Sequence, residues 1–312
     1  MKVFQSLDAY TAGPHPVATI GTFDGLHQGH KVILRRIIEE AKRLHGESVL
    51  ISFHPHPRLV LFPENNPLRL LHSLEEKIQM LDEMGLDKLL LIPFTKEFSR
   101  TPSKAFIRDT LIGKIGIQKI VIGYDHRFGK NRTGGIEELQ ELAQELQFEV
   151  EEIPAQAIDD ANISSTKIRK ALAAGDVSTA NTYLGYAYGF SGTVVHGAKQ
   201  GRTLGYPTAN LDPLEPHKLI PTDGVYLVRA MLGEEIHHGL MSIGSKPTMG
   251  GTQQFYEVFI FDFNRDIYDQ VLRVEFLSFL RGQQKFKGLD ELMTAMKRDE
   301  ANGRELVASF SS

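Results

Sequence analysis

Residues 21–30 are Gly21-Thr22-Phe23-Asp24-Gly25-Leu26-His27-Gln28-Gly29-His30, and they separate a short apolar run from a helical segment. A strand, a glycine-rich turn and a helix in this order bring backbone N–H groups and the positive end of the helix dipole toward an anion. His27 and His30 can donate hydrogen bonds to a phosphate without carrying a permanent charge. The segment therefore predicts a phosphate-handling site.

The first half of the chain alternates short apolar segments with amphipathic helical segments. This alternation predicts a parallel sheet covered by helices on both faces, with its ligand site at the carboxyl ends of the strands. Residues 73–76 are Ser-Leu-Glu-Glu, a capping box that marks the start of one helix. The expected strands are residues 17–20, 48–53, 88–92, 119–123 and 149–153, and the expected helices are 31–43, 74–84, 104–111 and 136–146.

The second half begins with a helix pair and then changes to strand-like segments separated by turns. Their spacing predicts an antiparallel barrel or sandwich. We place the boundary near residues 185–189, which gives domains 1–186 and 187–312. The expected helices are 165–174, 177–184 and 289 to about 302, and the expected strands are 190–196, 224–231, 236–243, 255–261 and 272–279.

The composition is that of an ordinary globular protein, with 41% apolar and 24% charged residues. The net charge of -4 argues against a nucleic-acid partner, because such proteins gather basic residues on one surface. The absence of cysteine excludes disulfides and thiolate metal sites. Without a signal peptide or an apolar run of membrane-spanning length, we expect a cytoplasmic protein with no membrane partner. Homo-oligomerisation remains open.

A second phosphate-type segment occurs at Ile163-Ser164-Ser165-Thr166-Lys167-Ile168-Arg169. Three hydroxyl residues at a helix start offer donors to a phosphate, and Arg169, one turn further, can make a forked contact. A plain serine N-cap with a solvated arginine would give the same letters. Residues 27–30 fit the His-x-Gly-His signature of the nucleotidylyltransferase superfamily. Together, the two segments predict attack on the α-phosphorus of ATP, with Mg²⁺ bridging the phosphates and His27, His30 and Arg169 neutralising charge.

Two loops that follow expected strands are candidates for substrate contacts. Gly123-Tyr124-Asp125-His126-Arg127-Phe128-Gly129-Lys130 lies where a base- or substrate-contacting loop belongs. It is not a Walker A loop, because its glycine spacing is off by one and Asn131 replaces Ser or Thr. Phe53-His54-Pro55-His56-Pro57 fits a rigid proline-bounded turn and a substrate wall equally well.

The most informative stretch of the second half is Gly197-Ala198-Lys199-Gln200-Gly201-Arg202-Thr203-Leu204-Gly205-Tyr206-Pro207-Thr208-Ala209-Asn210. Its glycines make a flexible loop able to wrap phosphate, and Thr208 and Asn210 offer oxygen ligands suited to Mg²⁺-ATP. In an extended segment these two side chains share a face. A glycine-rich hairpin connection would look similar. Glu257 lies in an otherwise apolar strand, where it is either a buried base or a solvated side chain.

These motifs together resemble the prokaryotic bifunctional riboflavin kinase/FAD synthetase family over nearly the whole chain. The resemblance also uses Val274-Glu275-Phe276-Leu277, leading to Lys285-Phe286. It implies an α/β nucleotidylyltransferase domain with a Rossmann-like parallel sheet, followed by an antiparallel β-barrel riboflavin kinase domain with a terminal helix. The barrel would phosphorylate riboflavin to FMN with ATP. The first domain would adenylylate FMN to FAD and release pyrophosphate.

The resemblance assigns roles to individual residues. Glu257 matches the general base of the kinase, with Glu275 as a rival on the next strand, and Thr208 and Asn210 match the Mg²⁺-ATP ligands. The other residues expected to bind ATP in the synthetase are Gly21, Thr22, Phe23, Asp24, Gly25, Gly29, Gly123, Asp125, Ser164, Ser165 and Thr166. Those expected to bind ATP in the kinase are Gly197, Gly201, Arg202 and Gly205, and those expected to contact flavin are Phe53, Pro55, His56 and Phe128.

The chain departs from the family's pattern at His54, His126, Ser242 and Tyr268-Asp269. By the resemblance, the two histidines fall on the flavin or adenine side of the synthetase. One alternative is a single-activity nucleotidylyltransferase whose barrel senses flavin, although a sensor needs no base. Another is a non-catalytic flavin carrier, which would not need His27, His30 and Arg169.

Overall fold

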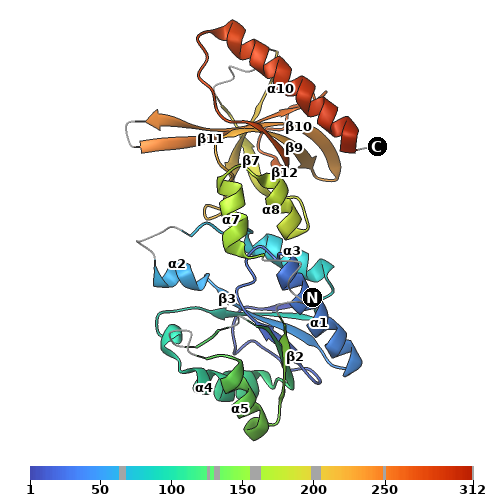
Figure 1. The fold of residues 1–312 in the computed structure, drawn as a ribbon, viewed down its shortest axis with the longest axis vertical. Coiled ribbons are helices and arrows are strands. Elements are labelled where there is room, and N and C mark those ends of the chain that lie inside the picture. The colour runs from blue at the N-terminus through green and yellow to red at the C-terminus, as the bar shows by residue number, and fades with distance from the viewer. Residues whose placement is uncertain are drawn as a thin grey trace. The chain divides into compact units, whose positions relative to one another are not determined.

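The computed structural model describes residues 1–62, 68–124, 127–129, 134–154, 163–197, 205–248 and 251–310. The chain forms two compact units, Met1–Ser165 and Thr166–Ser312 (Figure 1). The helix pair that follows residue 164 is thus grouped largely with the second unit. The expected extent of the functional domains, with a boundary after residue 186, stays a prediction.

The first unit is built on a six-stranded sheet in the order β1-β4-β3-β2-β5-β6, and all of its strand pairs are parallel. The five expected strands are confirmed. The additional strand β1 pairs with β4 at the edge of the sheet, and its three residues are too few to give a periodic pattern. The strands are β1 (Lys2–Phe4), β2 (Val17–Ile20), β3 (Ser48–His54), β4 (Lys88–Pro93), β5 (Lys119–Gly123) and β6 (Glu149–Ile153).

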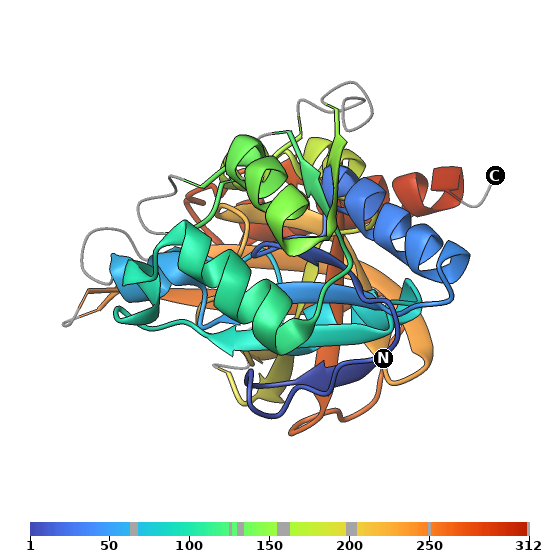
Figure 2. The ribbon, with the colours of Figure 1, turned by 90° about the horizontal axis from the view of Figure 1, so that it is seen from below.

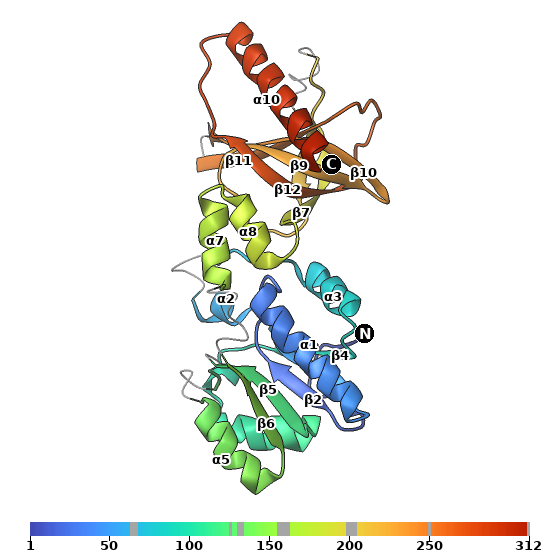
Figure 3. The same cartoon turned by 45° about the vertical axis from the view of Figure 1, so that its right-hand side comes forward.

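Helices cover both faces of this sheet, which explains why its central strands are mostly apolar and do not alternate between polar and apolar residues. Leu50 packs on one side with α1 (Gln28–Arg43) and α3 (Leu74–Glu83). Its neighbours Val49 and Ile51 pack on the other side with the helices before β5 and β6. Figure 3 shows α1 and α5 (Ile136–Leu146) on opposite faces. The capping box at the start of α3 is confirmed.

The segment expected as one helix over residues 104–111 is longer and less regular than predicted. A short α4 (Ser103–Ala105) leads into η2 (Phe106–Ile115), which is a π-helix. It ends at Gly116, whose φ of 73° is left-handed and so suits glycine. Figure 2 shows η2 and α5 side by side on their face of the sheet.

The second unit contains a closed barrel with strand order β10-β11-β8-β7-β12-β9. All of its strand pairs are antiparallel, so the predicted barrel is confirmed. The strand missed by the sequence is β8, because its polar residues lack a clear alternation. The strands are β7 (Gly189–Val195), β8 (Ala209–Pro213), β9 (Gly224–Leu232), β10 (Glu235–Thr248), β11 (Gly251–Ile260) and β12 (Val271–Arg281).

Among the residues that the structure describes, three helices accompany the barrel. α7 (Ser165–Ala173) and α8 (Val177–Leu184) precede it, and Asn181 of α8 donates to the Phe276 carbonyl of β12 at 2.8 Å. α10 (Leu289–Phe310) extends further than predicted because Leu306 and Val307 add to the apolar contacts with the outer face of the barrel. In Figures 1 and 3, α10 lies across the barrel on the side away from α7 and α8.

Candidate active sites

The turn after β2 adopts a conformation that few sequences allow. Phe23, Gly25 and Leu26 have φ values of 47°, 90° and 40°, all in the left-handed region that non-glycine residues rarely occupy. A Cβ atom at Gly21 would lie 2.9 Å from the Phe23 ring, so this position also needs glycine. The tight turn brings the chain from the end of β2 directly to the start of α1, where His27 is the N-cap residue.

His27 and His30 lie together at the start of α1. Their rings stack with centroids 3.6 Å apart, and Nδ1 of His27 accepts from the His30 backbone N–H at 3.3 Å. The Nδ1 atom of His30 is buried and has no hydrogen-bond partner among the described residues. Burial, and then the neighbouring His27, His72 and Lys77, hold the pKa of His30 well below 6.5. The ring is therefore neutral at pH 7.

Two buried residues that the sequence analysis missed lie behind the turn. The Lys77 amine donates to the Thr22 carbonyl at 2.7 Å and to Oγ of Ser52 at 2.6 Å. His72 contacts the Phe23 carbonyl through Nε2 at 3.0 Å. One signal for Lys77 was present in the sequence, because it stands between Leu74, Ile78 and Leu81 on the apolar stripe of its helix.

The side chain of Asp24 is also directed into the protein. It is 4% exposed, and its Oδ1 accepts from the Leu71 backbone N–H at 3.0 Å and lies 3.8 Å from Nδ1 of His72. The carboxylate therefore ties the turn to residues 71–72. If Asp24 contacts ATP, it would do so through its backbone atoms and not through its carboxylate.

The segment 163–169 connects to the same turn through Ser165, whose hydroxyl donates to the Asp24 carbonyl at 2.8 Å. Ser165 begins α7 at the end of the first compact unit. Thr166 and Arg169 follow within the same helix and belong to the second unit. Their proposed contacts with ATP stay predictions, as does that of Ser164.

Aromatic side chains gather where β3 and β4 end. Phe53 lies 5.6 Å from Phe94 and 5.9 Å from Phe98 between ring centroids, and Phe98 lies 6.0 Å from Phe106. Because ligands bind at the carboxyl ends of parallel strands, Phe94 and Phe98 join Phe53 as candidate flavin contacts that sequence reasoning missed. Their signal was a pair of aromatic residues within six positions of the end of an expected strand.

The other residues expected to contact flavin are Phe128, His56 and Pro55, and their side chains differ in accessibility. Phe128 is only 8% exposed and packs in the core against Phe106, which leaves little of its ring for a flavin. His56 is the N-cap of α2 (Pro57–Leu61), and its Nδ1 accepts from the Arg58 backbone N–H at 3.2 Å. Pro55 lies between β3 and this cap, and Gly123 ends β5. Asp125 and His126 lie outside the described residues.

In the barrel, the strand register brings Glu257 and Asn210 together. They are direct partners in the pairing of β11 with β8, and Ser242 of β10 is the partner of Glu257 on the other side. Paired residues of antiparallel strands project from the same face. Phe259, two residues further along β11, packs in the same apolar cluster as Leu306 and Val307 of α10. Asn210, Glu257 and Ser242 therefore share the outer face of the barrel that α10 partly covers.

The side-chain amide of Asn210 packs directly against the backbone at Gly197. A Cβ atom at Gly197 would lie 2.2 Å from Nδ2 of Asn210, so glycine leaves the space that this amide occupies. Tyr206 packs its ring on Phe259 with centroids 4.9 Å apart, and burial followed by a hydrogen bond to Glu300 raises its pKa. Gly205, beside it, has a left-handed φ of 80°. Gly201 and Arg202 lie outside the described residues.

The two carboxylates considered as bases differ in their contacts. Glu275 accepts from Nε of Arg229 at 2.9 Å and from Nε of Arg273 at 3.3 Å, so both of its oxygens are held by guanidinium groups. Glu257 is half-buried on the face that carries Asn210. Both oxygens of Glu275 are thus already engaged in hydrogen bonds, and this favours Glu257 as the group that accepts the substrate proton.

Two family models match the chain in the expected order. Residues 11–167 match the family described as FAD synthetase, and residues 184–307 match the family described as riboflavin kinase. The bifunctional riboflavin kinase/FMN adenylyltransferase of Escherichia coli K12 is 35% identical over 308 residues, which cover 98% of this chain and 97% of that protein. The chain belongs to this bifunctional family. Both enzyme domains are present, and the fold class expected from the resemblance is confirmed.

Two further similar proteins also match this chain over nearly its whole length. The protein of the same name from Listeria monocytogenes is 35% identical over 295 residues, covering 94% of this chain and 93% of the relative. A crystal structure of a macrolide-efflux protein from Streptococcus pneumoniae has a TM-score of 0.88 at 32% identity and covers 97% of this chain and 98% of its own. Among the helices that the structure describes here, none is long and apolar enough to cross a membrane.

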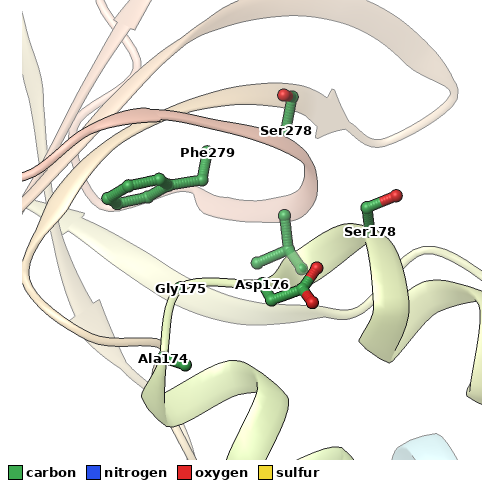
Figure 4. A pocket seen from close by; sticks show the side chains of 7 residues that line it. Ala174, Gly175, Asp176, Ser178, Ser278 and Phe279 are labelled. Atoms are coloured by element: carbon green, nitrogen blue, oxygen red, sulfur yellow. The ribbon is translucent and has the colours of Figure 1, made fainter.

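The second compact unit also contains a pocket. It has a volume of about 290 Å³ and lies where the turn between α7 and α8 meets β12 (Figure 4). Asp176 at this turn caps α8 by accepting from the Thr179 backbone N–H at 3.0 Å. The lining residues are Ala174, Gly175, Asp176, Val177, Ser178, Ser278 and Phe279. None of them was predicted to take part in either reaction.

Proposed function

We propose that this chain phosphorylates riboflavin to FMN in its barrel and adenylylates FMN to FAD in its parallel-sheet domain, using ATP in both steps. The observation that carries the proposal is the direct pairing of Glu257 with Asn210 in the barrel. It places a carboxylate beside the residue expected to hold ATP, which a flavin-sensing barrel would not require. The alternative of a single-activity nucleotidylyltransferase is therefore not favoured.

In the kinase reaction, Glu257 would accept the proton of the ribityl 5′-hydroxyl. The freed oxygen attacks the γ-phosphorus of ATP, the bond to the β-phosphate oxygen breaks, and ADP leaves. General base catalysis of this kind contributes about 10²–10⁴-fold to the rate. Asn210 and Thr208 would orient the phosphates, with Gly197, Gly201, Arg202 and Gly205 forming the surrounding loop.

The donor set in the barrel fits Mg²⁺. Thr208 offers a hydroxyl oxygen, and Asn210 offers an amide oxygen opposite the Glu257 carboxylate. Oxygen ligands of this kind suit a hard cation that also keeps phosphate and water ligands. When bound, the ion would neutralise charge on the phosphate oxygens of ATP. Thr208 and Asn210 are the residues we propose to hold it.

In the synthetase reaction, a phosphate oxygen of FMN attacks the α-phosphorus of ATP, and pyrophosphate leaves. The attacking group is already an oxyanion, so the protein contributes mainly position and charge stabilisation. The stacked His27 and His30 at the start of α1 would donate to the phosphates. Arg169 and the hydroxyl residues 164–166 would complete the site, and the aromatic residues around Phe53 would contact the flavin.

One assay tests both activities. The purified protein is incubated with riboflavin, ATP and Mg²⁺, and the flavins are separated by chromatography. FMN without FAD would exclude the synthetase, and riboflavin left unchanged would exclude the kinase. We expect His30→Ala to lower FAD formation from supplied FMN by at least tenfold and to leave FMN formation intact. Unchanged FAD formation would remove His30 from the mechanism.

A further inference from the structure

Three consecutive carbonyl groups of the turn after β2 accept hydrogen bonds from side chains far away in the sequence. The Thr22 carbonyl accepts from Lys77 at 2.7 Å, and the Asp24 carbonyl accepts from Ser165 at 2.8 Å. Between them, the Phe23 carbonyl lies 3.0 Å from Nε2 of His72. A carbonyl oxygen only accepts, so this nitrogen carries the ring proton.

These contacts fix the direction of the peptide groups as well as their position. A peptide group is planar and trans, so its N–H points away from its C=O. Holding the carbonyls of Thr22, Phe23 and Asp24 therefore also orients the N–H groups of the three residues that follow them. The same turn includes the left-handed residues Phe23 and Leu26, so its shape is not maintained by backbone preference.

Lys77 is well placed to hold the turn without touching a substrate. It is 5% exposed, reaches the turn from α3, and bonds Ser52 of β3 at the same time. The amine thus connects the turn to a neighbouring strand of the sheet. Lysine is almost never buried to this extent unless its charge is paired or hydrogen-bonded. Asp24 is the acidic group whose charge acts on it.

We propose that Lys77 and His72 are positioning residues for adenylyl transfer, which hold the Thr22 and Phe23 carbonyls and so present the start of α1 to the triphosphate of ATP. This inference rests on the proposed synthetase activity. Ser165 supplies the third of the three contacts and was already expected at the ATP site. Lys77 also places a positive charge behind the phosphate-facing side of the turn.

The protonation of the Lys77 amine provides a test, because a purely structural role of this residue would not make FAD formation depend on pH. Burial lowers the pKa of Lys77 to about 8, while Asp24 opposes this shift. The other titratable groups whose charges act at this place are His27, His30 and His72. The ammonium form prevails below pH 8, so kcat/KM for ATP in FAD formation should fall as the pH rises through about 8. This parameter reports groups of the free enzyme.

The test compares Lys77→Met with the wild-type chain at several pH values, using FMN and ATP as substrates. We expect kcat/KM for ATP to fall by about 10–100-fold, the scale of a misplaced catalytic group. The decline near pH 8 should disappear in the variant. Ser52→Ala is the matched control, because it keeps the contact with Thr22, and it should lose less than fivefold. FMN formation by the same chain should not change.

A chemical rescue covers the case in which Lys77→Met does not fold. The chain has no cysteine, so Lys77→Cys supplies a unique thiol. It is alkylated in denaturant with an aminoethyl or a propyl group and refolded, and unmodified wild-type protein undergoes the same cycle. The aminoethyl group restores the amine, whereas the propyl group restores only bulk. We expect the aminoethyl form to be at least tenfold more active in FAD formation.

The outcomes separate the role of Lys77 from the synthetase activity on which it depends. Equal activity of the aminoethyl and propyl forms, or an unchanged pH profile in Lys77→Met, would overturn the role of Lys77. A wild-type chain that forms no FAD would overturn the synthetase activity and this inference together. For His72, replacement by Gln keeps a side-chain N–H donor, and it should retain more FAD formation than His72→Ala. Equal loss in both variants would remove His72 from the proposal.

Discussion

Replacing Gly197 by alanine should disable the kinase while leaving the fold intact. The new Cβ would lie 2.2 Å from Nδ2, 2.4 Å from Cγ and 2.6 Å from Oδ1 of Asn210. Carbon contacts settle at about 3.5–4.0 Å, so the amide has to move by more than about 1 Å. The amide is the far end of a flexible side chain, and Gly197 has no left-handed φ, so rotation of Asn210 relieves the clash at little cost in stability.

The cost in activity is larger. A hydrogen bond to a charged group contributes about 1.5–3 kcal/mol, and each 1.4 kcal/mol is about a factor of ten. A displacement of about 1 Å in a catalytic site costs a similar factor, near 100-fold. We therefore expect FMN formation by Gly197→Ala to fall by about 10–100-fold in kcat/KM for ATP. FAD formation from supplied FMN should stay at the wild-type level.

A double-mutant cycle isolates the cause. Asn210→Ala alone should produce a loss of the same size, and Gly197→Ala should add little in that background because the clashing amide is gone. Gly288→Ala is the control, since a Cβ there meets nothing within 4 Å. Full kinase activity in Gly197→Ala would refute the reasoning, and so would losses that add in the double variant.

Two other predictions follow from carboxylates in contrasting surroundings. Glu257→Gln should lower FMN formation by at least about 100-fold while FAD formation persists. Glu275→Gln should chiefly lower thermal stability, because Arg229 and Arg273 lose their partner. If flavin chromatography instead showed loss of FMN formation in Glu275→Gln and not in Glu257→Gln, Glu275 would be the base. Glu40 accepts from Arg43 and Lys119, which lower its pKa to about 2. Its ionised form therefore stabilises the fold above about pH 4.5, and this contribution is lost as the pH falls toward about 2. Glu40→Gln should cost about 2 kcal/mol in denaturant unfolding at pH 7 and almost nothing near pH 2, and a constant difference across this range would contradict the assignment.

The sequence predicted most elements of the fold because short apolar segments alternate with amphipathic helical segments along its first half. Its failures have local causes. β1 is short, β8 is polar, and the π-helix at Phe106–Ile115 depends on hydrogen bonds that side-chain spacing does not encode. The extension of α10 depends on apolar contacts of Leu306 with a barrel that must already have formed.

The turn after β2, where we propose that phosphate binds, shows where prediction from sequence stops. Its glycines and histidines follow one another along the chain, so their shared location could be predicted. Lys77 and His72 come from a segment about fifty residues further along, and only the folded sheet brings them behind the turn. The pattern placed Lys77 on an apolar stripe, but it could not indicate which carbonyl the amine would meet.

The pairing of Glu257 with Asn210 has a consequence for variation in this barrel. The two residues are fixed by a ladder of backbone hydrogen bonds between neighbouring strands of a closed sheet, not by the loops that enter β8 and β11. A shift of one residue in this register would send both side chains to the other face, so the register is strongly constrained. Loops at the rim can therefore change in length and composition while the spacing between Glu257 and Asn210, the proposed base and the proposed ATP ligand, stays the same.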